Sequence, residues 1–343
     1  MTAGFDEATL VTHTGGYEIR QFLQTRANEE PFFLYIHNVE PHNPFDLSVT
    51  DSLVEQFGRV GFKERLRMLE LYTDFRAATR TGDSNAEENS ARQTEMLKEL
   101  ASMKEDTIDV LYDASVRLAD SRVGEVIQVL RESGAWENTL FLLVSDHGEE
   151  MGEHDGWQHD QSVYAELVHV PFLLRLPDAE HGGQRRDEPV TLVDVMPTLL
   201  DFLGAPMSAD QASGHSLIPA ITNQDGARED LNQAVRPAAQ RLNLKKYYKP
   251  FKEERGDLNL VLRQGPWKAI WNVEPDTIEL YHSGSDPIDQ ENLAGSHPDV
   301  EQAFRATIDE QFGALSFEEL RNLGGTWNLT PEQTENLRAL GYL

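Results

Sequence analysis

The 343-residue chain contains no cysteine. Disulfide bonds, thiolate metal ligands and a cysteine nucleophile are therefore excluded. Basic residues are also scarce, with 30 lysines and arginines against 59 aspartates and glutamates, for a formal net charge of −29. Because nucleic-acid-binding surfaces are basic, we expect no nucleic-acid partner.

Long apolar runs are missing as well. No stretch of the sequence reaches the roughly 18 apolar residues of a membrane span, so none is expected. Residues 1–7 have neither the basic nor the apolar region of a signal peptide. These absences assign no compartment to the protein.

What the sequence does contain is enough apolar material for a sizeable core, since 39% of its residues are hydrophobic. Helical and strand patterns alternate along the first two thirds, which predicts an α/β fold. The clearest helix runs from Asp106 to Ser133. Its apolar stripe is interrupted by Ser115 and Arg122, and Gly134 ends it. Further helices are predicted at 16–28 and at 191–203, where Pro197 implies a kink or a late start. Buried strands are predicted at 31–36, 139–144 and 170–177.

The texture changes from about Arg255. Short strands at 258–262, 267–272 and 277–281 are separated by turn residues and predict a small antiparallel sheet, followed by a terminal helix at 331–343. We therefore expect two regions. Residues 1–240 would form the α/β core, with a charged helical insertion at about 51–104. Residues 241–343 would form a C-terminal subdomain.

The most informative segment is the strand that ends at Val144, with Asp146, His147 and Gly148 just after it. Its apolar run is typical of a fully buried strand in a parallel sheet, and ligands of open α/β sheets bind at that end of a strand. Adjacent side chains of a strand point to opposite faces, so both residues reach one metal only if the chain turns, which Gly148 permits. A plain polar turn is the alternative.

Several other histidines are candidates. His42 lies in Pro41-His42-Asn43-Pro44, a stiff loop that suits a general acid or a hydrogen bond to substrate; a surface histidine is the alternative. His159 precedes a predicted helix and could face an anion. His154 is the weaker candidate because its surroundings could form a solvated turn, and His37 could be a satisfied histidine near the core.

In order and spacing, five stretches resemble the sulfatases of the alkaline-phosphatase superfamily. They are 31–45, 112–124, 138–154, 159–171 and 193–200. The resemblance implies an α/β fold in which helices flank a central, mostly parallel sheet, with a small C-terminal antiparallel sheet and a helix. It also implies hydrolysis of a small-molecule or saccharide sulfate ester.

The resemblance further implies roles for four residues. Asp146 and His147 match the family's late metal-site pair, His42 matches its catalytic histidine, and His159 matches a cationic position near the sulfate. The expected metal is Ca²⁺, and His147 leaves Mn²⁺ or Zn²⁺ open because imidazole suits transition metals. The metal would act as a Lewis acid on the sulfate oxygens.

Two features of the family are not found. Its nucleophile is a formylglycine made in a Cys/Ser-x-Pro/Ala-x-Arg motif, and neither this motif nor the early aspartate pair occurs in the sequence. The chain thus resembles the C-terminal portion of a sulfatase, and a complementary N-terminal chain or segment is expected. Without that segment, an open sheet edge and apolar surface would be exposed. Two alternatives stay open: a phosphate ester or phosphonate hydrolase of the same superfamily, and an inactive binding or structural module.

Overall fold

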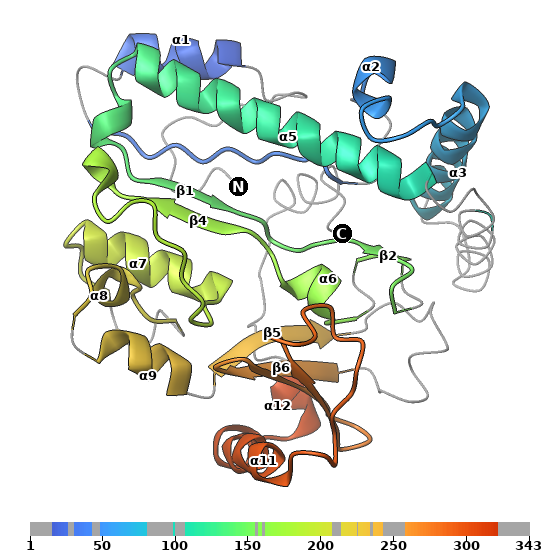
Figure 1. Ribbon diagram of the computed structural model, residues 1–343, viewed down its shortest axis with the longest axis vertical. Coiled ribbons are helices and arrows are strands. Elements are labelled where there is room, and N and C mark those ends of the chain that lie inside the picture. Colours follow the sequence, from blue (N-terminus) through green and yellow to red (C-terminus); the bar gives the residue numbers. More distant parts are fainter. Residues whose placement is uncertain are drawn as a thin grey trace.

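The computed structural model places helices above a narrow sheet and a second sheet below it (Figure 1). It describes residues 16–26, 31–42, 49–80, 99, 107–154, 157–159, 162–207, 214–224, 226–233, 236–242 and 258–321. The predicted helix at 331–343 lies outside these residues. Within them, no helix has the length and apolar character that a bilayer crossing requires.

The long helix α5 (Thr107–Glu132) runs across the upper part of the molecule and contributes to two hydrophobic clusters (Figure 1). One half of its buried face packs with α2 (Asp51–Val54) and α3 (Phe62–Arg80). The other half packs with α1 (Gly16–Arg26), the short helix η1 (Trp136–Asn138) and strand β1. Gly134 ends the helical region with φ +76°, as the sequence predicted.

The sheet beneath α5 consists of β1 (Phe141–Val144) and β4 (Phe172–Arg175), which pair in antiparallel register with Val144 opposite Phe172. Phe141 packs towards α1 and α5, whereas Phe172 packs against α8 (Ile218–Ile221) and α9 (Ala227–Gln233). The sheet therefore separates two hydrophobic clusters, as expected of an α/β fold.

Two details of the predicted sheet are wrong. The β1 strand is neither parallel to its described partner nor fully buried, since Val144 is 39% exposed. Residues 31–39 run extended along β1 (Figure 1) but are assigned to no strand. Their even-numbered side chains from 32 to 36 still pack in the α1–α5 cluster, so the predicted burial of one side of this segment is correct.

Short elements flank β4 between residues 150 and 207. They are β2 (Glu150–Met151), β3 (Trp157–Gln158), α6 (Ala165–Val168), η2 (Pro177–Ala179), η3 (Leu192–Asp194) and α7 (Val195–Phe202). The first two of them, β2 and β3, pair with each other. The late start that Pro197 predicted is confirmed: the α-helix begins at Val195, and a separate 3₁₀ turn precedes it.

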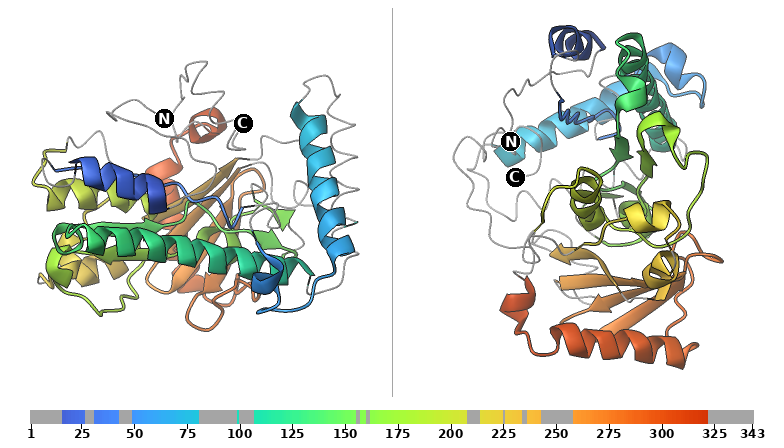
Figure 2. Two further views of the ribbon diagram at one scale, coloured as in Figure 1. Left: turned by 90° about the horizontal axis from the view of Figure 1, so that it is seen from above. Right: turned by 90° about the vertical axis from the view of Figure 1, so that its left-hand side faces the viewer.

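The lower sheet is antiparallel, in the order β5 (Arg236–Leu242), β6 (Leu258–Gln264), β7 (Trp267–Asn272) and β8 (Thr277–His282). One face packs on α11 (Pro298–Phe312) and α12 (Phe317–Arg321), which lie on the side away from the rest of the molecule (Figure 2). Val261, Ile270 and Tyr281 on the other face contact Val163 and Tyr164. The three predicted strands are thus confirmed, while β5 and α11 were not predicted.

Candidate functional site

The Asp146-His147-Gly148 turn follows β1 directly and is held by its own polar groups. The Asp146 carboxylate accepts a hydrogen bond from the His147 backbone N–H at 3.0 Å. The Ser145 hydroxyl donates to the His147 carbonyl at 2.7 Å. Both side chains of the predicted metal pair are therefore fixed on a short, self-bonded turn at the end of the strand.

Gly148 was expected to permit a turn of the chain, but the structure requires a glycine here for a different reason. Its φ lies outside the left-handed region, so conformational freedom is not the reason for a glycine here. Instead, its N–H donates to the Leu167 carbonyl at 2.8 Å. A Cβ at this position would lie 1.9 Å from the Glu166 carbonyl oxygen. The turn packs so closely on α6 that only a glycine fits.

The tautomer of His147 follows from its neighbours. Its Nδ1 lies 2.8 Å from the Gly148 carbonyl oxygen, which can only accept a hydrogen bond, so Nδ1 carries the proton. In the neutral ring, Nε2 then has the lone pair. Nε2 lies 3.9 Å from the carboxylate of Asp146, whose side chain is 54% exposed. The lone pair of His147 and the carboxylate of Asp146 are therefore neighbours, and the carboxylate is open to solvent.

His42 is positioned by the turn that ends the extended segment 31–42. Its N–H donates to the Val39 carbonyl at 3.0 Å. Within that turn the Glu40 side chain is only 4% exposed and lies 3.6 Å from the Arg122 Nε of α5. This ion pair was not predicted from the sequence. One signal for it was present, because Arg122 is a charged residue in the apolar stripe of the helix.

Three histidines from separate segments meet at this end of the sheet. The Nε2 atoms of His159 and His42 are 3.3 Å apart. The ring of His147 lies 4.3 Å from that of His159 and 6.4 Å from that of His42, measured between ring centroids. The structure therefore brings together all four residues that the sequence analysis singled out: His42, Asp146, His147 and His159.

Tyr35 is an additional member that the sequence analysis missed. Tyr35 is an exposed residue whose hydroxyl is only partly removed from water; this partial desolvation, and then the negative charge of Asp146, raise its pKa above the ordinary value of 10.0. Its hydroxyl lies 3.2 Å from the His37 Nδ1, and the two rings are stacked. Its alternation with the apolar residues Phe32, Leu34 and Ile36 was the available signal. His37 is half-buried beside this tyrosine rather than in the core.

Asp146 and His147 could form only part of a metal site. Asp146 and the lone pair of His147 are chemically suitable ligands, a carboxylate for Ca²⁺ and an imidazole for Zn²⁺ or Mn²⁺. Within the part of the chain that the structure describes, however, no three His, Asp or Glu side chains are grouped to hold an ion. These residues supply at most two ligands, fewer than any of these ions requires.

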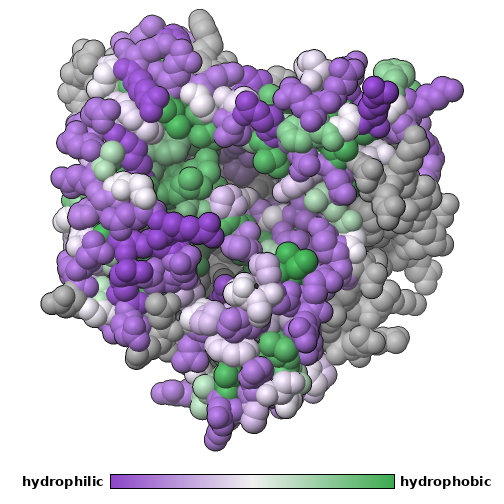
Figure 3. All heavy atoms as spheres, in the orientation of Figure 1, coloured by the Kyte–Doolittle hydropathy of each residue, from purple (hydrophilic) through white to green (hydrophobic). Residues whose placement is uncertain are grey.

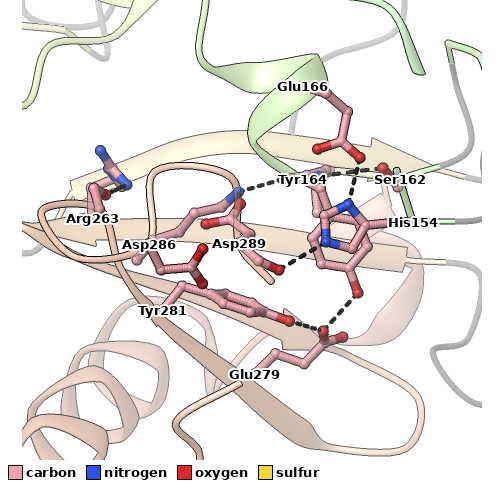
Figure 4. Close-up of polar contacts among 12 residues, drawn as sticks. His154, Ser162, Tyr164, Glu166, Arg263, Glu279, Tyr281, Asp286 and Asp289 are labelled. Atoms are coloured by element: carbon pink, nitrogen blue, oxygen red, sulfur yellow. Dashed lines mark hydrogen bonds and ion pairs between the residues drawn. The ribbon is translucent and has the colours of Figure 1, made fainter. Parts of the chain in front are cut away.

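His154, the weaker candidate, does not lie in a solvated turn. Its side chain is 13% exposed and lies between the core and the lower sheet, with its ring stacked on Tyr164 at 3.8 Å (Figure 4). The neighbouring Tyr164 and Tyr281 hydroxyls both donate to the Glu279 carboxylate. Lys268 and Asp289 form an ion pair with both side chains 2% exposed. The contact between the two parts of the molecule is thus strongly polar.

Comparison with known proteins identifies the family. The family model described as Sulfatase matches residues 16–205, which are 190 of the 343 residues. The chain belongs to the sulfatase family. A second model, described as N-sulphoglucosamine sulphohydrolase, C-terminal, matches residues 152–315 of this sulfatase-family chain. Together the two matches include all four singled-out residues and all of β6 to β8.

Individual relatives agree with this family. Arylsulfatase K of Danio rerio is 32% identical over 215 residues, covering 59% of this chain and 37% of the relative. An arylsulfatase of Clostridium perfringens is 29% identical over 231 residues, covering 66% of this chain and 45% of the relative. The sulfatase-family chain therefore spans less than half the length of these curated relatives.

A solved structure supports the fold. The phosphonate monoester hydrolase of Agrobacterium radiobacter superposes with a TM-score of 0.58 at 20% identity, over 86% of this chain and 59% of that one. The predicted alkaline-phosphatase-like α/β class is thereby confirmed for this sulfatase-family chain.

Proposed function

We propose that this chain provides one side of the active site of a sulfate-ester hydrolase. The observation that carries the proposal is the convergence of His42, His147 and His159 beside the Asp146 carboxylate, from segments up to 117 residues apart. Imidazoles that meet at the end of a strand can bind an anion when protonated and move a proton when neutral.

Each residue has a proposed task. His159 binds the sulfate, and His42, 3.3 Å from it, binds the same anion or protonates the leaving oxygen. Asp146 and His147 would hold a divalent cation, for which Ca²⁺ is our first choice. When bound, such an ion supplies Lewis acidity towards the sulfate oxygens.

We further propose that a complementary sulfatase segment supplies the formylglycine and the remaining metal ligands. An exposed apolar surface supports this. Phe33, Tyr35 and Leu173 on the extended segment and β4 are 64%, 58% and 56% exposed. Figure 3 shows hydrophobic side chains in a hollow over the region where Figure 1 draws β1 and β4. Exposed apolar side chains that gather in a hollow commonly mark a protein interface.

Anion binding tests the first proposal without requiring turnover. Sulfate titrated into the chain in a calorimeter should bind, and His159→Ala should weaken binding by about tenfold or more, because a charge-assisted hydrogen bond contributes about 1.5–3 kcal/mol. His282→Ala, on β8, is the matched control and should bind as the wild type does. Equal binding by both variants would refute the assignment of His159, and tighter binding of phosphate than of sulfate would favour the phosphate-ester alternative.

Turnover tests the second proposal. With 4-nitrophenyl sulfate and Ca²⁺ or Mn²⁺, the chain alone should show no hydrolysis, because no residue of it provides the nucleophile. Turnover that is abolished by His42→Ala and by Asp146→Asn would place a nucleophile within this chain. The complementary segment would then be unnecessary, while the assignment of the site would stand.

A further inference from the structure

His154 has both ring nitrogens engaged across the contact between the core and the lower sheet. Its Nδ1 lies 2.6 Å from the Glu166 carboxylate of α6. Its Nε2 lies 2.8 Å from the backbone carbonyl of Asp289, in the loop that follows β8. Figure 4 shows the ring between these two partners, which come from opposite sides of the contact.

Both partners are acceptors. A backbone carbonyl has no hydrogen to donate, and a carboxylate has none either. A neutral imidazole carries only one N–H and could satisfy only one of them. The geometry therefore requires two N–H groups on the ring, which is the imidazolium form.

The surroundings of the ring decide whether this charge is stable there. Burial disfavours it and is the largest single influence on the pKa of His154. The hydrogen bonds to Glu166 and to the Asp289 carbonyl, together with the charges of both carboxylates, outweigh burial and raise the pKa above its ordinary 6.5. The titratable groups that lie near the ring or near its partners come from several neighbouring elements: Tyr164, Glu166, Arg263, Lys268, Glu279, Tyr281, Asp286 and Asp289. Arg263 and Lys268 are the cations among them, and four carboxylates offset them.

The same contact reaches the candidate site through α6. While its carboxylate binds His154, Glu166 places its backbone carbonyl against Gly148, where no side chain would fit. The next residue, Leu167, accepts the hydrogen bond of the Gly148 N–H at 2.8 Å. His154 itself lies on the connection between β2 and β3, which leads to His159.

We propose that His154 is a positioning residue: as a protonated imidazolium, it ties the C-terminal sheet to α6 and so fixes the turn that presents Asp146 and His147. Only the description of that turn as an active site rests on the proposed function. The protonation of His154 and its link to the turn are properties of the fold and are tested separately.

The sign of the pH dependence follows from the direction of the shift. A histidine whose folded-state pKa is raised stabilises the fold fully below the unfolded value of about 6.5, and this contribution is lost as pH rises through the folded pKa. The tie should therefore be intact in mildly acidic solution and should weaken at alkaline pH.

Nuclear magnetic resonance of the full chain provides the test. In spectra that correlate the ring hydrogens with the ring nitrogens, His154 should show two protonated nitrogens at pH 6.5, assigned by loss of the signal in His154→Gln. The hydrogen-exchange protection factor of the Gly148 amide should fall about tenfold or more in that variant, since a charged hydrogen bond is lost. His282→Gln replaces an imidazole of the same sheet whose Nδ1 contacts Ser285; it is the control and should leave the protection unchanged.

Two results would overturn the proposal. One is a singly protonated His154 at pH 6.5, and the other is unchanged Gly148 protection in His154→Gln. If that variant does not fold, the wild type alone decides: Gly148 protection must fall as pH rises through the His154 titration. Failure of sulfate to bind would contradict the proposed function and leave this result unaffected.

Discussion

Replacing Gly148 by alanine tests how tightly the Asp146–His147 turn is packed. The added Cβ would meet the Glu166 carbonyl oxygen at 1.9 Å and the Glu166 carbonyl carbon at 2.9 Å. To reach even 3.0 Å, the oxygen must retreat by about 1.1 Å, and it belongs to backbone rather than to a flexible side chain. Overpacking that shifts backbone costs about 1–3 kcal/mol. The Gly148–Leu167 hydrogen bond would be lost with the shift, at about 0.5–1.5 kcal/mol.

We therefore expect Gly148→Ala to lower the free energy of unfolding by about 2–4 kcal/mol. Urea denaturation followed by circular dichroism measures this change. Gly124→Ala is the matched control. Gly124 lies inside α5 with nothing within 4 Å of its added Cβ, so alanine should stabilise the chain by about 1 kcal/mol. A Gly148→Ala variant within about 0.5 kcal/mol of the wild type would show that the turn is not packed on α6 as described.

Three further outcomes are expected. Lys268→Met should destabilise the fold by about 3–5 kcal/mol in urea denaturation, because it leaves the 2%-exposed Asp289 carboxylate without its partner. A variant in which Asp289 is also replaced by an apolar residue has no unpaired charge and should lose less stability; a larger loss in that double variant would contradict this. Asp146→Asn should lower the pKa of Tyr35 towards 10.0 in an ultraviolet titration referenced to Tyr35→Phe, since a negative charge that disfavours the phenolate is removed; an unchanged titration would mean that the two groups are not neighbours. Phe33→Ser, at a 64%-exposed site, should change stability by less than about 0.5 kcal/mol and reduce the binding of an apolar dye; undiminished dye binding would place the apolar surface elsewhere.

The helices and strands whose signals lie within a short stretch of sequence could be predicted from the sequence. The 3.6-residue period of α5, its end at Gly134 and the turn-bounded strands β6 to β8 were all predicted. The antiparallel pairing of β1 with β4 was not predicted. Strand direction is set by where the chain travels between the two strands, and the apolar run itself contains no record of that path.

In the candidate site, too, single residues could be predicted from the sequence, but their contacts could not. His42 and His159 were singled out from their loops and from the family resemblance, and their meeting 117 residues apart has no local signal. His154 was ranked as the weaker candidate because its neighbours in sequence, Glu153, Asp155 and Gly156, could form a solvated turn. Its actual partners are 12 and 135 residues away. A buried charge can be recognised only when the groups that surround it are known.

The polar contact shown in Figure 4 also limits which C-terminal subdomains this core can accept. An apolar interface tolerates a foreign partner of similar shape, whereas a buried polar group that bonds across a contact requires its partner in the same place. A chimera that joins this core to the sheet of a relative would have to transfer Lys268 and Asp289 along with the strands, and to retain His154 and Glu166. A foreign sheet would need an acceptor for the His154 Nε2 and a donor for the Val163 carbonyl at the same two points.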